Sequence, residues 1–298
     1  MSIRSQISSN ITKTYLIMVA FVAFVIMLAY VLGHALGYGN SWMGLAVFFS
    51  VICSFAGYYW GDRIVLAMSG ARPADRRRDF DFFTVAENLA MAAGLPKPKL
   101  YIIEDTAMNA FATGRDPAHA VICATSGILN RLERRELEGV IAHELSHIQN
   151  FDTRLMAVVA VLVGTVAYLG DLFLRNLWWG GRRNRDEDRG LGGILMIAGI
   201  VLALISPLIA TLIQLALSRR REYLADAQAA NLTRFPEGLA EALAKLAKDK
   251  EVLEAATNAT AHLYITNPFK GKEFGAWFSS LFDTHPPIAE RIRILRAM

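Results

Sequence analysis

The pattern with the clearest chemical meaning is His143-Glu-Leu-Ser-His147, inside a run from Glu133 to Asn150 with helical periodicity. Residues four apart lie on one face of a helix, so both imidazoles would project to the same side. That spacing suits two ligands of one Zn²⁺, and Glu144 would stand where a carboxylate can take a proton from a zinc-bound water. The alternative is a solvated amphipathic helix that carries two histidines by chance. The apolar positions of the run favour the metal site, because they recur at helical spacing: Leu137, Val140, Ile141, Leu145 and Ile148.

A catalytic zinc also needs a third protein ligand and an open position. Glu138 and Asp152 are near the pair in sequence, but neither is evidently aimed at the same point. Farther along the chain, Glu222 and Asp226 are four residues apart and share a helix face. One of them could bind the metal while the other holds a histidine ring. The alternative is a charged helix face that balances the adjacent arginines, and spacing alone leaves both interpretations open.

The elements that must position these residues include four long apolar blocks, in a chain of 298 residues of which 54% are hydrophobic. Tyr15–Leu32 and Trp42–Trp60 are uncharged and long enough to cross a bilayer core of about 30 Å. We therefore expect residues 1–60 to form a transmembrane hairpin with helices at about 15–33 and 42–60. We expect a second apolar hairpin over residues 155–217, with helices at about 155–179 and 191–217. The sequence leaves open whether the block at 155–179 spans the bilayer, re-enters it or lies between domain and membrane.

The distribution of Lys and Arg predicts the orientation. The N-terminal tail carries Arg4 and Lys13, five arginines follow Trp60, and the connection 33–41 has neither residue type. Because cytoplasmic loops collect Lys and Arg, both termini and the long polar segments should be cytoplasmic. The Arg-rich connection 182–189 would then lie outside, and its role is unexplained.

The polar segments 61–154 and 218–298 should form one domain, interrupted in sequence by the second hairpin. We expect an Arg-rich helix or linker near 71–79 and helices at Phe80–Ala93, 218–231 and 236–256 and from Pro287. Three short runs have strand-like composition: Lys99–Glu104, Met108–Thr113 and His119–Ala124. The chain is thus predicted to be an α-helical membrane protein with a mainly α, α+β domain.

Composition excludes some other classes. The net charge of +4 would permit nucleic-acid binding, but the chain has no such signature, and membrane orientation explains the basic residues better. Cys53 and Cys123 form neither a CxxC pair nor a disulfide framework, which indicates a reducing compartment. We expect no nucleic-acid partner.

These motifs together resemble the HtpX family of bacterial membrane zinc proteases, which is related to the CAAX prenyl proteases and the mitochondrial stress protease OMA. The family has His-Glu-x-x-His just before an apolar block and Glu-x-x-x-Asp just after the next, as in this chain. Three further stretches are similar to the family's: Met108-Asn-Ala-Phe-Ala-Thr-Gly114, Val121-Ile-Cys-Ala-Thr-Ser-Gly127 and Thr284-His-Pro-Pro-Ile-Ala-Glu-Arg291. The resemblance covers nearly the whole chain.

The resemblance implies a zincin-type protease domain that holds one Zn²⁺ per chain. His143, His147 and Glu222 would be its ligands, Glu144 the general base, and Asp226 the residue that orients His143.

It also implies residues that handle the substrate. His285 would face the cleft and help to bind substrate or stabilise the transition state. Asn109 and Ala110 would belong to the edge strand of a small sheet above the active-site helix, where an extended peptide could add as a further strand.

The implied function is membrane-protein quality control by an endopeptidase of the bacterial inner membrane. It would cleave misfolded or damaged membrane proteins on the cytoplasmic side during stress. The expected partners are these membrane-protein substrates, the lipid bilayer and other proteins of membrane quality control. Two alternatives remain. One is a proteolytically silent scaffold, against which the intact Glu144 argues, and the other is a prenyl-peptide protease, for which four apolar blocks are few to enclose a chamber.

Overall fold

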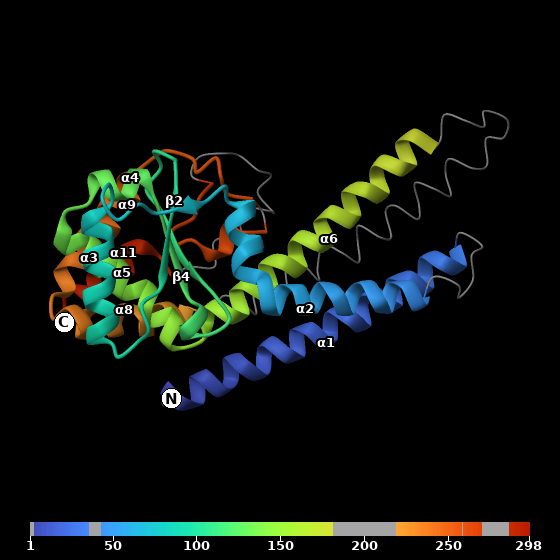
Figure 1. The fold of residues 1–298 in the computed structure, drawn as a ribbon, viewed down its shortest axis with the longest axis horizontal. Coiled ribbons are helices and arrows are strands. Elements are labelled where there is room, and N and C mark those ends of the chain that lie inside the picture. The colour runs from blue at the N-terminus through green and yellow to red at the C-terminus, as the bar shows by residue number, and fades with distance from the viewer. Residues whose placement is uncertain (1–2, 36–42, 181–218, 258, 270–285) are drawn as a thin grey trace.

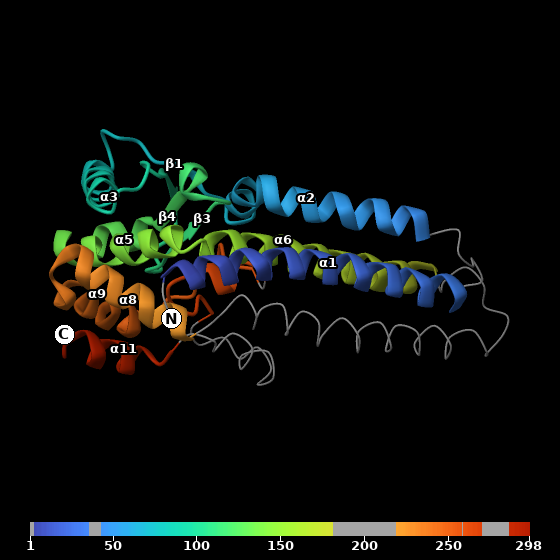
Figure 2. The same cartoon turned by 90° about the horizontal axis from the view of Figure 1, so that it is seen from below.

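The computed structural model describes residues 3–35, 43–180, 219–257, 259–269 and 286–298. A mixed α/β domain stands at one end, and three long helices extend from it (Figure 1). These are α1 (Ile3–Ala35), α2 (Met43–Met68) and α6 (Asp152–Gly180). Figure 2 shows all three leading away from the domain, and Figure 1 shows α6 diverging from α1 and α2 with distance from it. The predicted fourth apolar block and the Arg-rich connection 182–189 lie outside the described residues.

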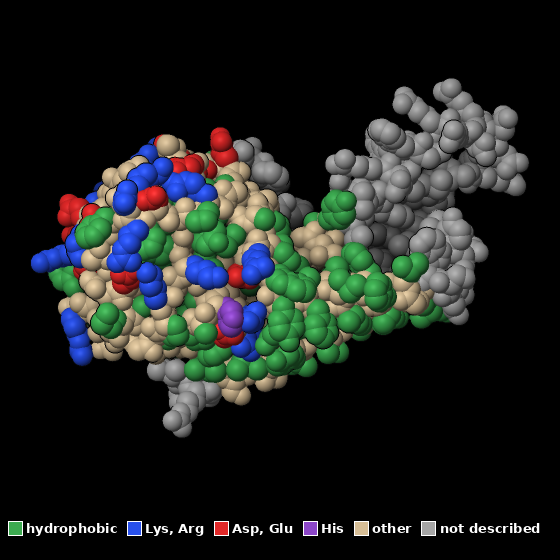
Figure 3. Space-filling view, in the orientation of Figure 1, with side chains coloured by type: hydrophobic (Ala, Val, Ile, Leu, Met, Phe, Trp, Pro, Cys, Tyr) green, Lys and Arg blue, Asp and Glu red, His purple; other side chains and the backbone are tan. Residues whose placement is uncertain are grey.

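Within the described residues, two segments are long and apolar enough to cross a membrane, Ile7–Met27 in α1 and Met43–Met68, the whole of α2. Their outward faces carry exposed apolar side chains, among them Leu16, Val19 and Phe48. Figure 3 shows hydrophobic side chains along the helices, whereas charged side chains gather over the domain. Such an apolar exterior is the surface that lipid would cover.

Helix α1 packs on α6 through a stripe of residues four apart. Ile17, Phe21 and Val25 are buried in one cluster with Leu155, Val159 and Leu162. Because residues four apart share a helix face, the two helices meet along one line. The start of α6 thus lies between α1 and the domain.

The domain contains a four-stranded sheet in the order β1-β2-β4-β3. Its strands are β1 (Arg72–Pro73), β2 (Lys99–Ile103), β3 (Ala110–Thr113) and β4 (Val121–Thr125). β2 and β4 are parallel, and the other two pairs are antiparallel. The mainly helical fold with a small sheet is therefore confirmed.

Strand β1 was not predicted, since the stretch 71–79 was expected to be a helix or linker. Two residues that include a proline are too short to give an alternating pattern. Arg72 helps to hold this strand, because its Nε donates to Glu104 Oε1 at 2.8 Å, just beyond the end of β2.

Helices cover the sheet and form the core around α5 (Arg134–Gln149). The others are α3 (Phe80–Ala92), α4 (Ser126–Arg131), α8 (Arg219–Thr233), α9 (Pro236–Lys248) and α11 (Ile288–Leu295). The predicted helix 236–256 was too long, because α9 ends at Lys248. The next residue, Asp249, instead accepts from the Met108 N–H at 2.7 Å and from Arg131 Nη1 at 3.2 Å.

Candidate metal centre

The histidine pair lies on α5, whose start and end are both well defined. A capping box joins Glu133 and Glu136 at the start, which satisfies two backbone N–H groups there. At the end, Phe151 adopts a left-handed conformation with φ of 58°. α6 begins at the next residue and leaves at 83° to α5. This bend places the beginning of α6 beside the end of the histidine helix.

Three side chains converge as the family resemblance implied. One ligand atom each from His143, His147 and Glu222 lie within 4.8 Å of one another, and all three residues are buried. The two Nε2 atoms are 3.2 Å apart. Glu222 approaches both rings, with Oε1 3.5 Å from His147 Nε2 and Oε2 3.7 Å from His143 Nε2.

A carboxylate stands behind each histidine. Asp226 Oδ1 lies 3.0 Å from His143 Nδ1, where the resemblance placed it. Asp152 Oδ2 lies 3.0 Å from His147 Nδ1, a contact that the sequence did not predict. Both contacts favour a proton on Nδ1 and leave Nε2 free to bind a metal.

An arginine supports each of these aspartates. Arg291 donates to both oxygens of Asp226, and Arg221 Nη1 donates to Asp152 Oδ1 at 3.2 Å. Arg291 is fully buried and also lies 3.6 Å from Glu222 Oε2. Sequence reasoning missed its role, although the residue ends the His-Pro stretch on which the family resemblance was based.

The charges around the histidines fit a divalent cation. In the described part of the chain, four buried carboxyl groups interact with the pair: Glu144, Asp152, Glu222 and Asp226. Two buried guanidinium groups oppose them, those of Arg221 and Arg291. With both imidazoles neutral, as metal ligands must be, and all four carboxyl groups ionised, two negative charges remain, and uncompensated buried charge is costly. Two imidazoles and one carboxylate are also a donor set typical of catalytic zinc, so the residues fit Zn²⁺.

Glu144 sits beside this cluster with an unusual proton affinity. Burial raises the pKa of its carboxyl group to about 7, and the nearby charge of Glu222 acts in the same direction. The backbone N–H of Ala112 in β3 donates to it and opposes this shift. For His147, burial lowers the pKa, but the contacts with Asp152 and Glu222 outweigh it and raise the pKa to about 9. Glu144 is therefore a carboxyl group able to exchange a proton near neutral pH.

The predicted substrate residues lie on the β3 side of the site. β3 pairs with β4 along one edge. Along the other edge, where the sequence predicted an exposed strand, another segment of the same chain already bonds to part of the strand. Ile265 N–H donates to Ala110 O at 3.0 Å, and Asn109 Nδ2 donates to Thr266 O at 3.1 Å. His285 lies outside the described residues.

Comparison with known proteins identifies the family. The model for peptidase family M48 matches residues 77–298. The chain belongs to peptidase family M48. Its M48 relatives include proteins named protease HtpX homolog from several bacteria, matched over 98% of this chain. That of Caldanaerobacter subterraneus subsp. tengcongensis is 43% identical over 96% of its own length, and that of Streptococcus uberis 40% over 99%.

Among solved structures, the M48 chain is similar to the crystal structure of S. mikatae Ste24p, with a TM-score of 0.49 and 19% identity. The match covers 98% of this chain and 66% of that one. The resemblance inferred from the sequence is confirmed by the HtpX homologs. This M48 protein is an HtpX-type membrane zinc metallopeptidase, with His143, His147 and Glu222 as its zinc site.

Proposed function

We propose that this metallopeptidase cleaves misfolded or damaged membrane proteins at the cytoplasmic face of the bacterial inner membrane, as part of a stress response. The observation that carries the proposal is the position of the zinc site relative to the apolar helices. Only Asn150 and Phe151 separate α5 from α6, and the first turns of α6 pack against the candidate span in α1 (Figure 1). A site so placed can reach polypeptide that emerges from the bilayer.

The distribution of basic residues supports the cytoplasmic side. Arg63 and the arginines between 72 and 78 follow the apolar part of α2 on the domain side, and the connection 33–41 carries neither Lys nor Arg. By the positive-inside rule the domain, with both termini, faces the cytoplasm. The division into hairpins 1–60 and 155–217 and domain segments 61–154 and 218–298 belongs to the same proposal.

The proposed reaction is hydrolysis of a peptide bond with Glu144 as general base. Zinc bound at the triad would supply Lewis acidity to the water and to the scissile carbonyl. Glu144 takes a proton from the attacking water and passes it to the departing amine. A carboxyl group with a pKa of about 7 suits both transfers, because it holds and releases a proton near neutral pH. Asp226 keeps His143 in the orientation that the ligand set needs.

Substrate is proposed to bind as an extended strand along β3. Asn109 and Ala110 would supply the backbone and amide groups for this pairing. Because these groups bond to Ile265 and Thr266 in the structure, an incoming peptide must replace those contacts. His285 is proposed to act on the substrate from the cleft side.

The test compares wild type with Glu144→Gln in detergent and in liposomes. Both should bind about one zinc per chain, and only wild type should cleave casein and a membrane protein with an unfolded cytoplasmic loop. Zinc binding without cleavage by wild type would favour the scaffold. Cleavage restricted to a prenylated peptide would favour the prenyl-peptide protease, and cleavage only of loops on the other face would overturn the proposed orientation.

A further inference from the structure

The N-terminal membrane helix reaches the metal centre through one amide side chain. Asn10 of α1 donates from Nδ2 to Asp152 Oδ1 at 2.6 Å and to the backbone oxygen of Asn150 at 2.9 Å. Asp152 in turn contacts the zinc ligand His147. Asn10 and Asp152 are each 1% exposed, so these bonds form away from water.

We propose that Asn10 is a positioning residue of the zinc site, which makes α1 a structural part of the metal centre. The chain of contacts runs from Asn10 through Asp152 to His147. This proposal depends on the zinc site and not on the identity of the substrate. An experiment can therefore overturn it without overturning the quality-control proposal.

The arrangement of donors around Asp152 supports a positioning role. One oxygen, Oδ1, accepts from Asn10 of α1 and from Arg221 of α8, at 2.6 and 3.2 Å. The other oxygen, Oδ2, is left to His147. Because two elements hold Oδ1, the carboxylate cannot rotate freely, and Oδ2 stays aimed at the imidazole. A carboxylate fixed in this way also fixes the ring and its tautomer.

The second bond of Asn10 acts on the same geometry. Asn150 and Phe151 form the turn between α5 and α6, and Asn10 binds the backbone oxygen of Asn150. The Asn150 side chain also donates to Gln228 of α8 at 2.7 Å. A single amide of α1 thus holds the end of the histidine helix and the first residue of the next helix.

The position of Asn10 in the chain strengthens this inference. It lies in the candidate span Ile7–Met27, where an amide without partners would be costly. The apolar stripe of Ile17, Phe21 and Val25 already anchors α1 on α6, so anchoring alone would not require the amide. The amide adds directed hydrogen bonds to a residue that touches a zinc ligand.

The test measures zinc affinity in the full chain in detergent, by competition with a chelator. Asn10→Leu removes the amide at similar volume and should weaken zinc binding by about threefold to tenfold. Asp152→Asn acts directly on His147 and should weaken it by about 10–100-fold. Thr14→Val is the matched control, because Thr14 is buried one turn away on α1 and its hydroxyl donates to the backbone oxygen of Asn10. It should leave zinc affinity unchanged.

A double variant separates positioning from simple anchoring. If Asn10 acts through Asp152, adding Asn10→Leu to Asp152→Asn should cause little further loss of zinc affinity. An anchoring role predicts instead a lower Tm of the metal-free protein with the zinc dissociation constant unchanged. Either that result or full additivity in the double variant would overturn the proposal. If Asn10→Leu does not fold, Asn10→Ala provides the same comparison, because it also removes both bonds and introduces no branched side chain.

Discussion

Arg291 binds both carboxylate oxygens of Asp226, from Nε at 2.8 Å and from Nη2 at 2.7 Å. Both residues are almost completely buried. This paired geometry is the strongest form of an arginine–carboxylate interaction. It connects α11 to α8 and, through Asp226, to the zinc ligand His143, so the end of the chain supports the metal site.

Replacing Arg291 by leucine should destabilise the protein strongly. Asp226 would keep a buried charge without its main partner, at a cost of about 3–5 kcal/mol. Arg296→Leu is the control, since Arg296 pairs with Glu237 at 3.0 Å in an exposed position, where such pairs contribute about 1 kcal/mol or less. Thermal unfolding in detergent compares the two, and similar losses of Tm in both variants would contradict the role of Arg291.

Zinc should raise the Tm of the metal-free protein. Four buried carboxyl groups and two buried guanidinium groups surround the histidines, so the folded site suits a divalent cation. A ligand that binds only the folded state stabilises it by about 2.7 kcal/mol at a concentration 100 times its Kd. Glu222→Gln removes a ligand and should reduce this zinc-dependent increase. Glu138→Gln alters a carboxylate on α5 that pairs with Arg134 at 3.4 Å, and should keep it. An increase of the same size in all three proteins would place the zinc elsewhere.

Gly139→Ala should separate α5 from α9. A Cβ at Gly139 would lie 2.6 Å from Leu239 N and 2.7 Å from its Cα, and backbone atoms cannot yield as a flexible side chain does. Overpacking of this kind costs about 1–3 kcal/mol, seen as a lower Tm. At Gly164 a Cβ would meet only side-chain atoms at 3.5 Å, so Gly164→Ala is the control. Equal Tm values would show that the helices can move apart without cost.

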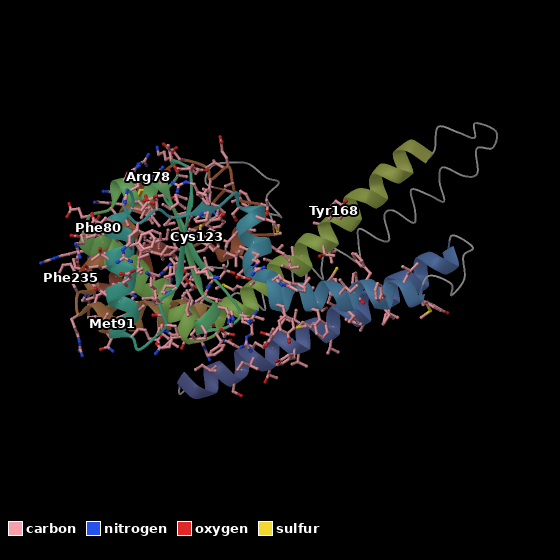
Figure 4. All side chains as sticks on the ribbon, in the orientation of Figure 1. Arg78, Phe80, Met91, Cys123, Tyr168 and Phe235 are labelled. Carbon is pink, nitrogen blue, oxygen red and sulfur yellow. The ribbon has the colours of Figure 1, made fainter. Side chains whose placement is uncertain are left out.

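Cys123 should react with an alkylating reagent only after unfolding. The residue lies on β4 within the domain (Figure 4), and burial raises the pKa of its thiol well above the usual 9.0. Above pH 9 the unfolded chain loses this proton while the folded one keeps it, so stability should fall by about 1.4 kcal/mol per pH unit.

The thiol experiment is best done in a Cys53→Ser background, where Cys123 is the single remaining cysteine. In this background, the further substitution Cys123→Ala should lose less stability between pH 9 and 10 than Cys53→Ser alone. Rapid alkylation of the folded protein at pH 8 would argue against the buried position.

Features that depend on residues close together in the chain could be predicted from the sequence, and features that depend on distant residues could not. His143, His147 and Glu144 were predictable because four-residue spacing on one helix fixes their relation. Glu222 needed the family resemblance, since its own neighbourhood fits a charged helix face equally well. Asp152 is near the pair in sequence but is not evidently aimed at the same point, and its contact with His147 depends on the bend between α5 and α6.

Other features depended on tertiary contacts that leave little trace in the local sequence. The end of α9 is determined by Asp249, whose partners Met108 and Arg131 are more than 100 residues earlier. Strand β1 is too short for any periodicity. The contact of Asn10 with Asp152 crosses 142 residues, so a polar residue near the start of an apolar helix gave no indication of its partner.

The left-handed turn at Phe151 has a mechanical consequence. A φ of 58° is unusual for a bulky residue, and the Phe151 ring is held by the Arg154 guanidinium 4.8 Å from its centroid. A turn this short and this constrained works as a rigid elbow rather than a hinge. A change in the direction of α6 relative to the domain would therefore turn α5 with it and alter the alignment of the two histidines.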